Sequence, residues 1–237
     1  MNLQLSQSEE NYLKSIFNLL NETDSNQVNT NLIAEDLNTK PSSVTEMIKK
    51  LSDKQLVGYR KYKGSNLTES GEKIAIQIIR KHRLWETFLV EKLSFNWNEV
   101  HDIAEQLEHI NSPLLTRRLS EFLSHPKFDP HGDPIPNEDG IFPKHDSEVK
   151  LTDLLLNQEA MVIKIGSDHT ALLSFLSNNN IGIHTQIKCL EKNDFDDSMK
   201  GMIGSDFTTY WHITKKLYNF SRIQLFRWRR NSLLCNR

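Results

Sequence analysis

The 237-residue sequence contains only two cysteines, Cys189 and Cys235, and both lie in its last fifty residues. This scarcity argues against a disulfide scaffold or a cysteine-based zinc module and fits a reducing compartment. The N-terminal residues carry no basic-then-apolar targeting pattern, and no apolar run is long enough to cross a bilayer. We therefore expect a cytoplasmic protein with no membrane partner.

The sequence also lacks an overall charge bias, because its formal net charge is −2. Any interaction with nucleic acid must therefore depend on local charge. The length favours two or three modules with separate cores, and 37% hydrophobic with 25% charged residues is typical of globular protein.

Residues 1–70 are predicted to form a winged helix-turn-helix. Apolar periodicity and turn residues predict helices at 8–20, 30–37 and 42–54 and a β-hairpin at 56–67. Ser8 is the expected cap of the first helix, and Pro41 suits the first position of the third. Three short helices followed by a hairpin are typical of this DNA-binding domain.

Positive charge is concentrated on the third predicted helix and the hairpin. Between Thr39 and Lys63 there are seven lysines and arginines, among them Lys54, against Glu46 and Asp53. Such residues can neutralise phosphates, and small polar residues can approach base edges. The predicted DNA-binding residues are Lys40, Ser42, Ser43, Thr45, Lys49, Lys50, Arg60, Lys61 and Lys63. A solvated basic helix, or a winged helix that contacts protein, is the alternative interpretation.

Residues 71–143 are predicted to form a second, helical module. Its helices are expected at 71–92, at 98–110 with Asn98 as the cap, and at 113–124. Pro126, Pro130, Pro134 and Pro136 follow, with Pro143 closing the stretch. This composition excludes a helix or a central strand, so we expect an ordered arm or a linker.

The predicted helix at 98–110 carries four metal-capable side chains on one face. With His101 at zero, Glu105 lies at about 40°, Glu108 at about −20° and His109 at about 80° around the helix. His82 and Glu86, four residues apart on the preceding helix, form a second pair that could complete the coordination. Imidazoles and carboxylates suit Mn(II), Fe(II), Co(II), Ni(II) or Zn(II).

Two other interpretations of this face are open. It could be an ordinary solvated face with incidental histidines, or the helices could hold the di-metal centre of an enzyme. The short helices, the one-sided ligand set and the adjacent basic winged helix argue against an enzyme.

Residues 149–218 are predicted to form a small β-rich domain. Alternating segments indicate strands at 160–165, 187–191 and 199–203, with a helix at 170–178. Residues 219–237 are treated as an atypical basic tail, because seven basic and no acidic residues occur between Lys215 and Arg237.

The sequence resembles the diphtheria-toxin-repressor family of iron- and manganese-dependent transcriptional regulators. The matching stretches are Ser8 to Lys14, Pro41 to Met47, Leu67 to Gly71, Arg80 to Glu86, Val100 to His109 and His131 to Pro136. More weakly, residues 149–218 are similar to the family's SH3-like C-terminal domain. The fold class implied is mainly α, with a winged helix, a helical metal-binding and dimerisation domain and an SH3-like domain.

The resemblance implies a homodimeric repressor that binds operator DNA and regulates metal homeostasis. It assigns Glu105, Glu108 and His109 to the primary metal site, and His82, Glu86 and His101 to an ancillary site. Asn11 stands at the position of the remaining primary ligand, where the iron type has methionine and the manganese type has aspartate. Lys14 also departs from the acidic residue of the manganese type. Because Glu105 is the manganese-like choice, the expected metal is Mn(II), with Fe(II) as the alternative.

Overall fold

The computed structural model describes residues 4–23, 25–60, 64–144, 148–166, 170–193, 195, 198–204, 209–213 and 223–227. The chain divides into two compact units. Unit 1 comprises Met1–Trp85, Asp102–Pro126 and Ile135–Phe142, and unit 2 comprises Glu86–His101, Lys127–Pro134 and Pro143–Arg237. The predicted helical module is therefore shared between the two units.

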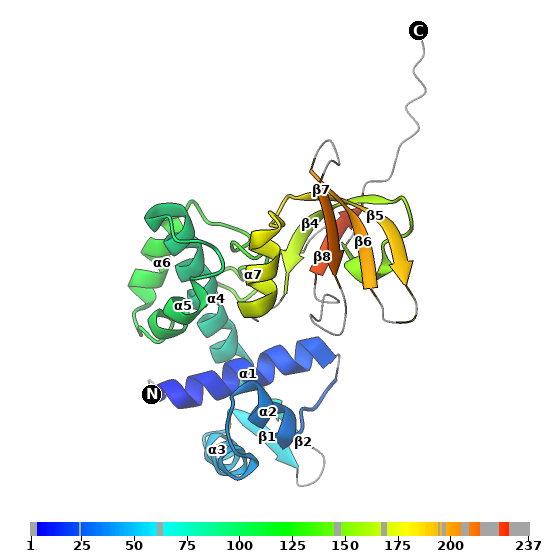
Figure 1. Ribbon diagram of the computed structural model, residues 1–237. Helices are drawn as coiled ribbons and strands as arrows, with labels where there is room; N and C mark the ends of the chain where they lie inside the picture. Colours follow the sequence, from blue (N-terminus) through cyan, green and yellow to red (C-terminus); the bar gives the residue numbers. More distant parts are fainter. Residues whose placement is uncertain are drawn as a thin grey trace, which may run out of the picture. The chain divides into compact units, whose positions relative to one another are not determined.

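Unit 1 begins with three helices and a hairpin, which confirms the predicted winged helix-turn-helix (Figure 1). Its elements are α1 (Gln7–Thr23), α2 (Thr30–Asp36), α3 (Pro41–Asp53), β1 (Val57–Arg60) and β2 (Gly64–Leu67). The two strands pair in antiparallel register. An apolar core that includes Leu13, Ile33, Ile48 and Val57 joins all three helices to the hairpin.

Helix α1 uses a different cap from the one predicted. The Ser6 Oγ accepts a hydrogen bond from the Glu9 backbone N at 3.3 Å, and the Glu9 carboxylate accepts one from the Ser6 backbone N at 2.8 Å. This reciprocal pair is a capping box. The prediction of Ser8 as cap was wrong, because the Ser-x-x-Glu spacing that satisfies both backbone donors begins at Ser6.

Glu9 links α1 electrostatically to α3. Its side chain is 2% exposed, and its Oε1 lies 2.5 Å from Lys54 Nζ and 3.4 Å from Lys50 Nζ. Burial raises the pKa of Glu9, but hydrogen bonds from Lys54, Ser6 and Lys50 outweigh it, and the pKa falls from 4.5 to about 2. Lys54 therefore pairs with a buried carboxylate. Its positive charge is one of the seven between Thr39 and Lys63 that the sequence suggests for phosphate binding.

Glu9 should make the stability of unit 1 sensitive to acid. The folded-state pKa lies below the unfolded value, so the stabilisation is complete above pH 4.5 and is lost as the pH falls toward 2. We expect the free energy of unfolding to drop by about 2 kcal/mol more between pH 6 and 3 in the wild type than in Glu9→Gln. Urea unfolding at both pH values measures this difference. Equal drops in the two proteins would contradict the assignment.

Three further helices follow the hairpin: α4 (Glu69–Leu93), α5 (His101–Leu107) and α6 (Pro113–Phe122). Helix α5 is shorter than the predicted 98–110, and Asn98 does not cap it. Glu99 Oε2 instead accepts hydrogen bonds from the Asn96 backbone and side chain at 3.3 and 3.0 Å, which holds a turn before the helix. After the helix, the Glu108 backbone N still bonds to Ala104 O at 2.8 Å, so Glu108 keeps the helical register.

Among the described residues, no helix combines the length and the apolar character that a bilayer crossing requires.

Unit 2 contains an antiparallel six-stranded sheet in the order β3-β8-β4-β5-β6-β7 (Figure 1). Its elements are β3 (Glu148–Lys150), the 3₁₀ helix η1 (Leu151–Asp153), β4 (Glu159–Ile165), α7 (Thr170–Asn178), β5 (Gln186–Asn193), β6 (Ser198–Ile203), β7 (Thr209–Ile213) and β8 (Ile223–Arg227). The core of the unit includes Val162, Leu176 and Leu225. The predicted strands and helix are present, and the β-rich C-terminal domain is confirmed.

Strand β8 lies beyond residue 218, where the prediction ended the third domain. It pairs with both β3 and β4, so it is an internal strand of the sheet. Ile223 and Leu225 are buried and alternate with the half-buried Gln224 and Phe226, which is the period of two that a strand requires. The segment was predicted to be a basic tail because arginines surround this short strand pattern. Residues 228–237 lie outside the described part of the chain.

The proline-rich stretch forms an ordered arm. In unit 2, Asp129 Oδ1 accepts hydrogen bonds from the backbone N of His131 at 2.8 Å and of Asp133 at 2.9 Å. The His131 carbonyl accepts a hydrogen bond from Ile165 N at 2.8 Å, which fixes the arm to β4. Proline prevents this segment from forming a helix or a central strand, and these side-chain and backbone hydrogen bonds hold it in a defined conformation instead.

Candidate metal centre and nucleic-acid interface

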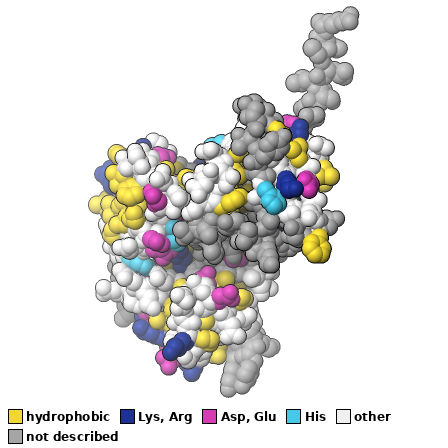
Figure 2. All heavy atoms as spheres, viewed as in Figure 1, with side chains coloured by type: hydrophobic (Ala, Val, Ile, Leu, Met, Phe, Trp, Pro, Cys, Tyr) yellow, Lys and Arg dark blue, Asp and Glu magenta, His cyan; other side chains and the backbone are white. Residues whose placement is uncertain are grey.

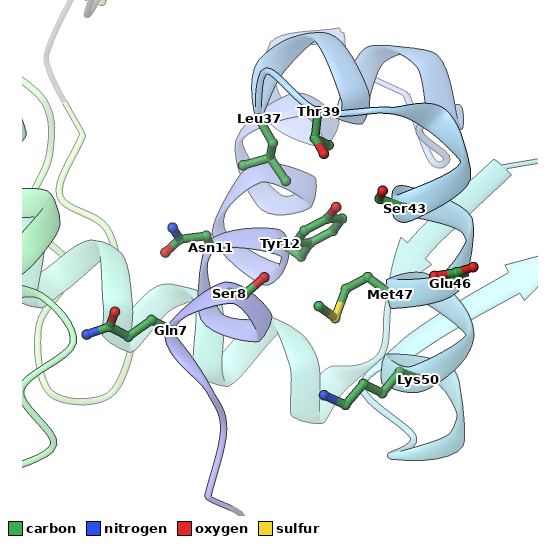
Figure 3. A pocket seen from close by; sticks show the side chains of 10 residues that line it. All are labelled: Gln7, Ser8, Asn11, Tyr12, Leu37, Thr39, Ser43, Glu46, Met47 and Lys50. Atoms are coloured by element: carbon green, nitrogen blue, oxygen red, sulfur yellow. The ribbon is translucent and has the colours of Figure 1, made fainter.

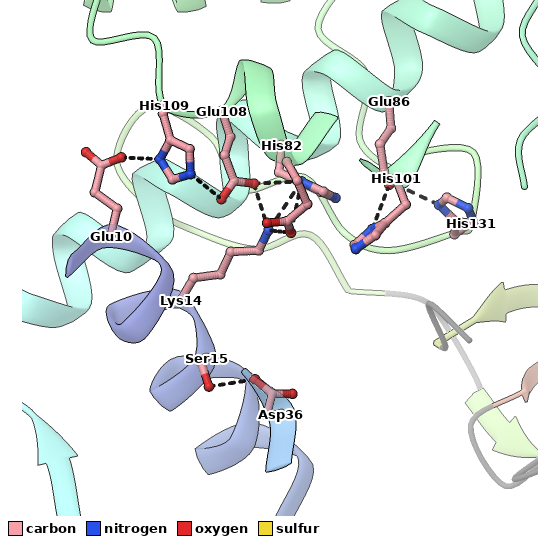
Figure 4. A network of polar contacts seen from close by, with 11 residues as sticks. Glu10, Lys14, Ser15, Asp36, His82, Glu86, His101, Glu108, His109 and His131 are labelled. Atoms are coloured by element: carbon pink, nitrogen blue, oxygen red, sulfur yellow. Dashed lines mark hydrogen bonds and ion pairs between the residues drawn. The ribbon is translucent and has the colours of Figure 1, made fainter. Parts of the chain in front are cut away.

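A buried polar cluster in unit 1 brings together His82 of α4 with Glu105, Glu108 and His109 of α5 and the turn after it. These four residues are termed the α5 cluster, of which Figure 4 labels His82, Glu108 and His109. The Nδ1 of His82 lies 2.7 Å from Glu108 Oε2 and 3.8 Å from Glu105 Oε1. A carboxylate only accepts, so the His82 Nδ1–H donates to Glu108. The predicted face of α5 therefore points toward α4, as the helical spacing required.

Lys14 of α1 extends into the same cluster. Its Nζ donates to Glu105 Oε1 and, at 2.7 Å, to Glu108 Oε2. Burial lowers the pKa of Lys14, but the charges of Glu108 and Glu105 outweigh it and raise the pKa. Burial likewise raises the pKa of Glu108, but hydrogen bonding to His82 and the charge of Lys14 bring it below the usual value. The ammonium and the carboxylate are therefore both charged at neutral pH.

His109 is oriented by a carboxylate that the sequence analysis did not identify. Its Nδ1 lies 2.6 Å from Glu10 Oε2 of α1 and donates to it, because the carboxylate can only accept. The ring then presents Nε2 as the acceptor atom, 4.0 Å from Glu108 Oε1. A carboxylate that fixes the tautomer of a histidine is common behind metal-ligating imidazoles.

Among the described residues of unit 1, three side-chain oxygens are buried without a hydrogen-bond partner: that of Ser65 in the hairpin and two that belong to predicted metal ligands. The latter two are Asn11 Oδ1 and Glu108 Oε1. An unsatisfied buried acceptor costs about 1–3 kcal/mol, so a cation at these oxygens would remove a real penalty. Figure 3 shows the Asn11 side chain leaving α1 on the side away from Met47. Glu108 Oε1 and His109 Nε2 therefore fit a divalent metal, which these two residues would hold, and Asn11 on α1, which also lines the cavity between α1 and α3, offers a further oxygen donor.

A second cluster lies in unit 2 and consists of Glu86, His101, Asp129 and His131. It is termed the arm cluster. Glu86 Oε1 lies 3.6 Å from His101 Nδ1, and Glu86 Oε2 lies 3.4 Å from His131 Nδ1 (Figure 4). Glu86, Asp129 and His131 are all buried and offer ligand atoms within 4.8 Å of one another. His131 Nε2 donates to the Trp97 carbonyl at 2.9 Å, so its Nδ1 is the atom that faces Glu86.

Glu86 and His101 were predicted as metal ligands from the sequence, whereas Asp129 and His131 were not. The sequence feature that could have identified them is the Asp-Pro-His-Gly run at residues 129–132, which places two metal-capable side chains close together in the proline-rich arm. The grouping of His82 with Glu86 and His101 stays a prediction; it follows from the position of His82 and Glu86 one helical turn apart on α4. The unit boundary falls between these two residues, and His82 contacts Glu108 within unit 1.

The predicted DNA-binding residues of α3 lie mostly at the surface. Those that are exposed are Lys40, Ser42, Ser43, Lys49 and Lys50. Thr45 is half-buried, and its Oγ1 donates to Pro41 O at 2.9 Å. The side chain of Arg60 and all of Lys61 and Lys63 lie outside the described part of the chain.

A cavity of about 640 Å³ opens beside this face, between the N-terminal half of α1 and α3 (Figure 3). Its lining includes Ser43, Glu46 and Lys50 from α3 and Tyr12 from α1. Burial raises the pKa of Tyr12, partly offset by a hydrogen bond with Thr39, so its phenol stays neutral at physiological pH. The cavity therefore offers polar groups of both helices beside the predicted recognition surface.

Comparison with known proteins places these features in a family. A model described as "Iron dependent repressor, N-terminal DNA binding domain" matches residues 4–65, and one described as "Iron dependent repressor, metal binding and dimerisation domain" matches residues 68–137. The iron-dependent repressor IdeR of Mycobacterium tuberculosis is 32% identical over 166 residues, which are 68% of this chain and 71% of IdeR. A solved structure described as a manganese-dependent transcriptional repressor in complex with manganese has a TM-score of 0.83 at 30% identity, covering 93% of this chain and 100% of that one.

A Chlamydia trachomatis protein described as a probable metal transport system membrane protein is 44% identical over 86 residues. The chain spans only 19% of the length of that protein. This match therefore concerns one segment and carries no membrane function to the present chain.

Proposed function

The chain belongs to the iron-dependent repressor family, which includes the diphtheria toxin repressor, and on that premise we propose that it is a metal-activated repressor of metal-homeostasis genes. It binds operator DNA through the winged helix when Mn(II) is bound at the α5 cluster. The observation that carries this proposal is the buried, unpartnered Glu108 Oε1, 4.0 Å from Nε2 of the oriented imidazole of His109. As a DNA-binding regulator it acts in the cytoplasm.

The donor atoms favour a hard or borderline ion. Amide and carboxylate oxygens with one imidazole suit Mn(II), and Fe(II) is the alternative because it accepts the same donors. The described residues of the α5 cluster include no sulfur ligand. The solved manganese-bound relative agrees with this choice, whereas IdeR is named for iron. The arm cluster is proposed as the ancillary site, with Glu86, His101, Asp129 and His131 as its ligands.

The proposed switch acts through α1, which carries the winged helix and also reaches the α5 cluster. Asn11 stands on α1, as does Glu10, which orients His109, while Glu108 and His109 follow α5, so one ion would be held by residues of both elements. A metal held by these residues would supply the positive charge that their oxygen and nitrogen donors lack. Helix α1 is then fixed, and with it α3, to which Glu9 is bonded. If the conformation that binds metal more tightly is also the one that fits operator DNA, each of these two ligands raises the affinity of the protein for the other.

The experiment is operator binding by fluorescence anisotropy, with anaerobically prepared protein and added Mn(II) or Fe(II). We expect either ion to raise affinity at least tenfold, corresponding to a coupling free energy of about 1.4 kcal/mol or more. Lys49→Ala should weaken binding and reduce the salt slope by about one, whereas Lys73→Ala, an exposed lysine of α4, should not. Equal DNA affinity with and without metal would overturn the proposal. Metal-dependent turnover without DNA would favour an enzyme.

The helical module also offers a surface for a second copy of the chain. Ile110, Leu114, Leu115 and Phe122, in and before α6, are between 39% and 62% exposed. Figure 2 shows hydrophobic side chains gathered on the face of unit 1 where α6 lies. Isolated hydrophobic residues are common on protein surfaces, but a group of adjacent ones indicates an interaction surface. The matching family model is described as a dimerisation domain, so we propose a homodimer through this surface.

Charges placed on this surface should separate the two copies. We expect Leu114→Glu/Phe122→Glu to sediment as a monomer at micromolar concentration, because each copy would bury two unpaired carboxylates in an apolar contact. Operator affinity should fall at least tenfold, since two linked winged helices bind two half-sites together. Sedimentation velocity measures the first effect. Phe195→Glu, at a residue 97% exposed in unit 2, is the matched control and should stay dimeric.

A further inference from the structure

We propose that Lys14 is an internal cation of the α5 cluster and restricts that cluster to a single metal ion. The inference rests on the proposed function, because it concerns how the same carboxylates divide their oxygens between an ammonium and a metal. It assigns to Lys14 a role in metal stoichiometry and affinity.

Lys14 occupies a position that would otherwise suit a metal. His82, Glu105 and Glu108 by themselves offer three ligand atoms within 4.8 Å of one another. The Lys14 ammonium contacts the Glu105 carboxylate and lies 2.7 Å from Glu108 Oε2 and 3.3 Å from His82 Nδ1 (Figure 4). Its hydrogen bonds thus use the same oxygens that an ion at this position would need.

The charges support this assignment. Two carboxylates and one ammonium leave the group of Glu105, Glu108 and Lys14 with one negative charge. The Lys14 side chain is 12% exposed and that of Glu108 is 0% exposed, so solvent and salt screen their interaction weakly. A dication in this position would have to displace the ammonium from both carboxylates.

The opposite side of Glu108 is left for the metal. Its Oε2 receives Lys14 and His82, whereas its Oε1 has no hydrogen-bond partner. His109 Nε2 lies 4.0 Å from that Oε1, and Asn11 Oδ1 on α1 is a further buried acceptor without a hydrogen-bond partner. Asn11 and Lys14 are three residues apart on α1, so they share one face of the helix. One oxygen of Glu108 therefore serves the ammonium and the other serves one metal ion.

The test counts metal ions in a Glu86→Gln background, which disables the arm cluster in every protein compared. Anaerobic equilibrium dialysis against Mn(II) should give one ion per chain for the otherwise wild-type protein and for Lys14→Arg, which keeps the cation. Lys14→Glu replaces the ammonium with a third carboxylate, so it should bind two ions and give the electron paramagnetic resonance spectrum of an exchange-coupled Mn(II) pair. Lys14→Gln should bind its first ion at least tenfold more tightly, because a nearby positive charge is gone.

Lys54→Gln is the matched control, because it removes an ammonium from the buried Glu9, and it should keep one ion with unchanged affinity. Thermal unfolding establishes that each variant is folded. If Lys14→Glu does not fold, the affinity of Lys14→Gln decides. Two ions in the protein that retains Lys14, or unchanged count and affinity in the Lys14 variants, would overturn the inference alone. No Mn(II) at all in the protein that retains Lys14 would overturn the proposed function as well.

Discussion

Replacing His109 with alanine is expected to abolish the metal-dependent gain in operator affinity. His109 Nε2 is the nitrogen donor beside the unpartnered Glu108 oxygen, and its ring is fixed by a hydrogen bond of 2.6 Å to Glu10. Loss of this donor leaves only oxygen ligands and removes one of the connections between the α5 cluster and α1. We expect Mn(II) affinity at the α5 cluster to fall at least about 100-fold, or about 2.7 kcal/mol. Isothermal titration with Mn(II) and anisotropy with operator DNA measure the two effects.

Two variants separate ligation from orientation. Glu10→Gln keeps the size of the side chain but no longer forces the Nδ1–H tautomer of His109, so it should reduce metal affinity by roughly tenfold to 100-fold. His125→Ala removes an exposed histidine that belongs to neither cluster and should leave both metal and DNA binding unchanged. Retention of the full metal-dependent gain by His109→Ala would contradict the proposed ligand set.

The winged helix was predictable because local patterns and the global fold agree in this part of the chain. Apolar residues at helical spacing, such as Leu13, Ile16 and Ile48, became the buried core. The face of α5 was predictable for the same reason, since residues 101, 105 and 108 fall on one side of any helix with 3.6 residues per turn. The errors at the ends of α5 and at the cap of α1 arose where side chains compete for a few backbone donors.

The rest of the candidate site could not be derived from the sequence, because its contacts join distant segments. Glu10 meets His109 across 99 residues, and Lys14 meets Glu108 across 94. The local periodicity of hydrophobic and polar residues gives no information about contacts between segments so far apart in the sequence. Lys14 illustrates the limit well, because the sequence marked it only as a departure from the ligand pattern. The structure shows the ammonium of this residue bonded to Glu105 and Glu108, where it offsets one of their two negative charges, and the resemblance offered no means to infer that contact.

The arm cluster depends on one backbone position, and Gly132→Ala is expected to disrupt it. Gly132 has a φ of +82°, and a Cβ there would lie 1.9 Å from the Ile163 carbonyl oxygen. Backbone strain and displacement of β4 together should cost about 3 kcal/mol or more of unfolding free energy in unit 2. His131 precedes Gly132 and bonds to Ile165 through its carbonyl, so the substitution should also move a ligand of the arm cluster.

Gly182→Ala is the matched comparison, because it makes the same chemical change in the same unit without a steric cost. A Cβ at Gly182 would meet nothing within 4 Å. We expect its unfolding free energy to be unchanged or to rise by up to about 1 kcal/mol through the unfolded chain. Urea unfolding monitored by tryptophan fluorescence, with Mn(II) counted by dialysis, compares the two. Equal stability would show that β4 can move away from the arm. Lower stability in Gly132→Ala with an unchanged metal count would remove His131 from the proposed ligands.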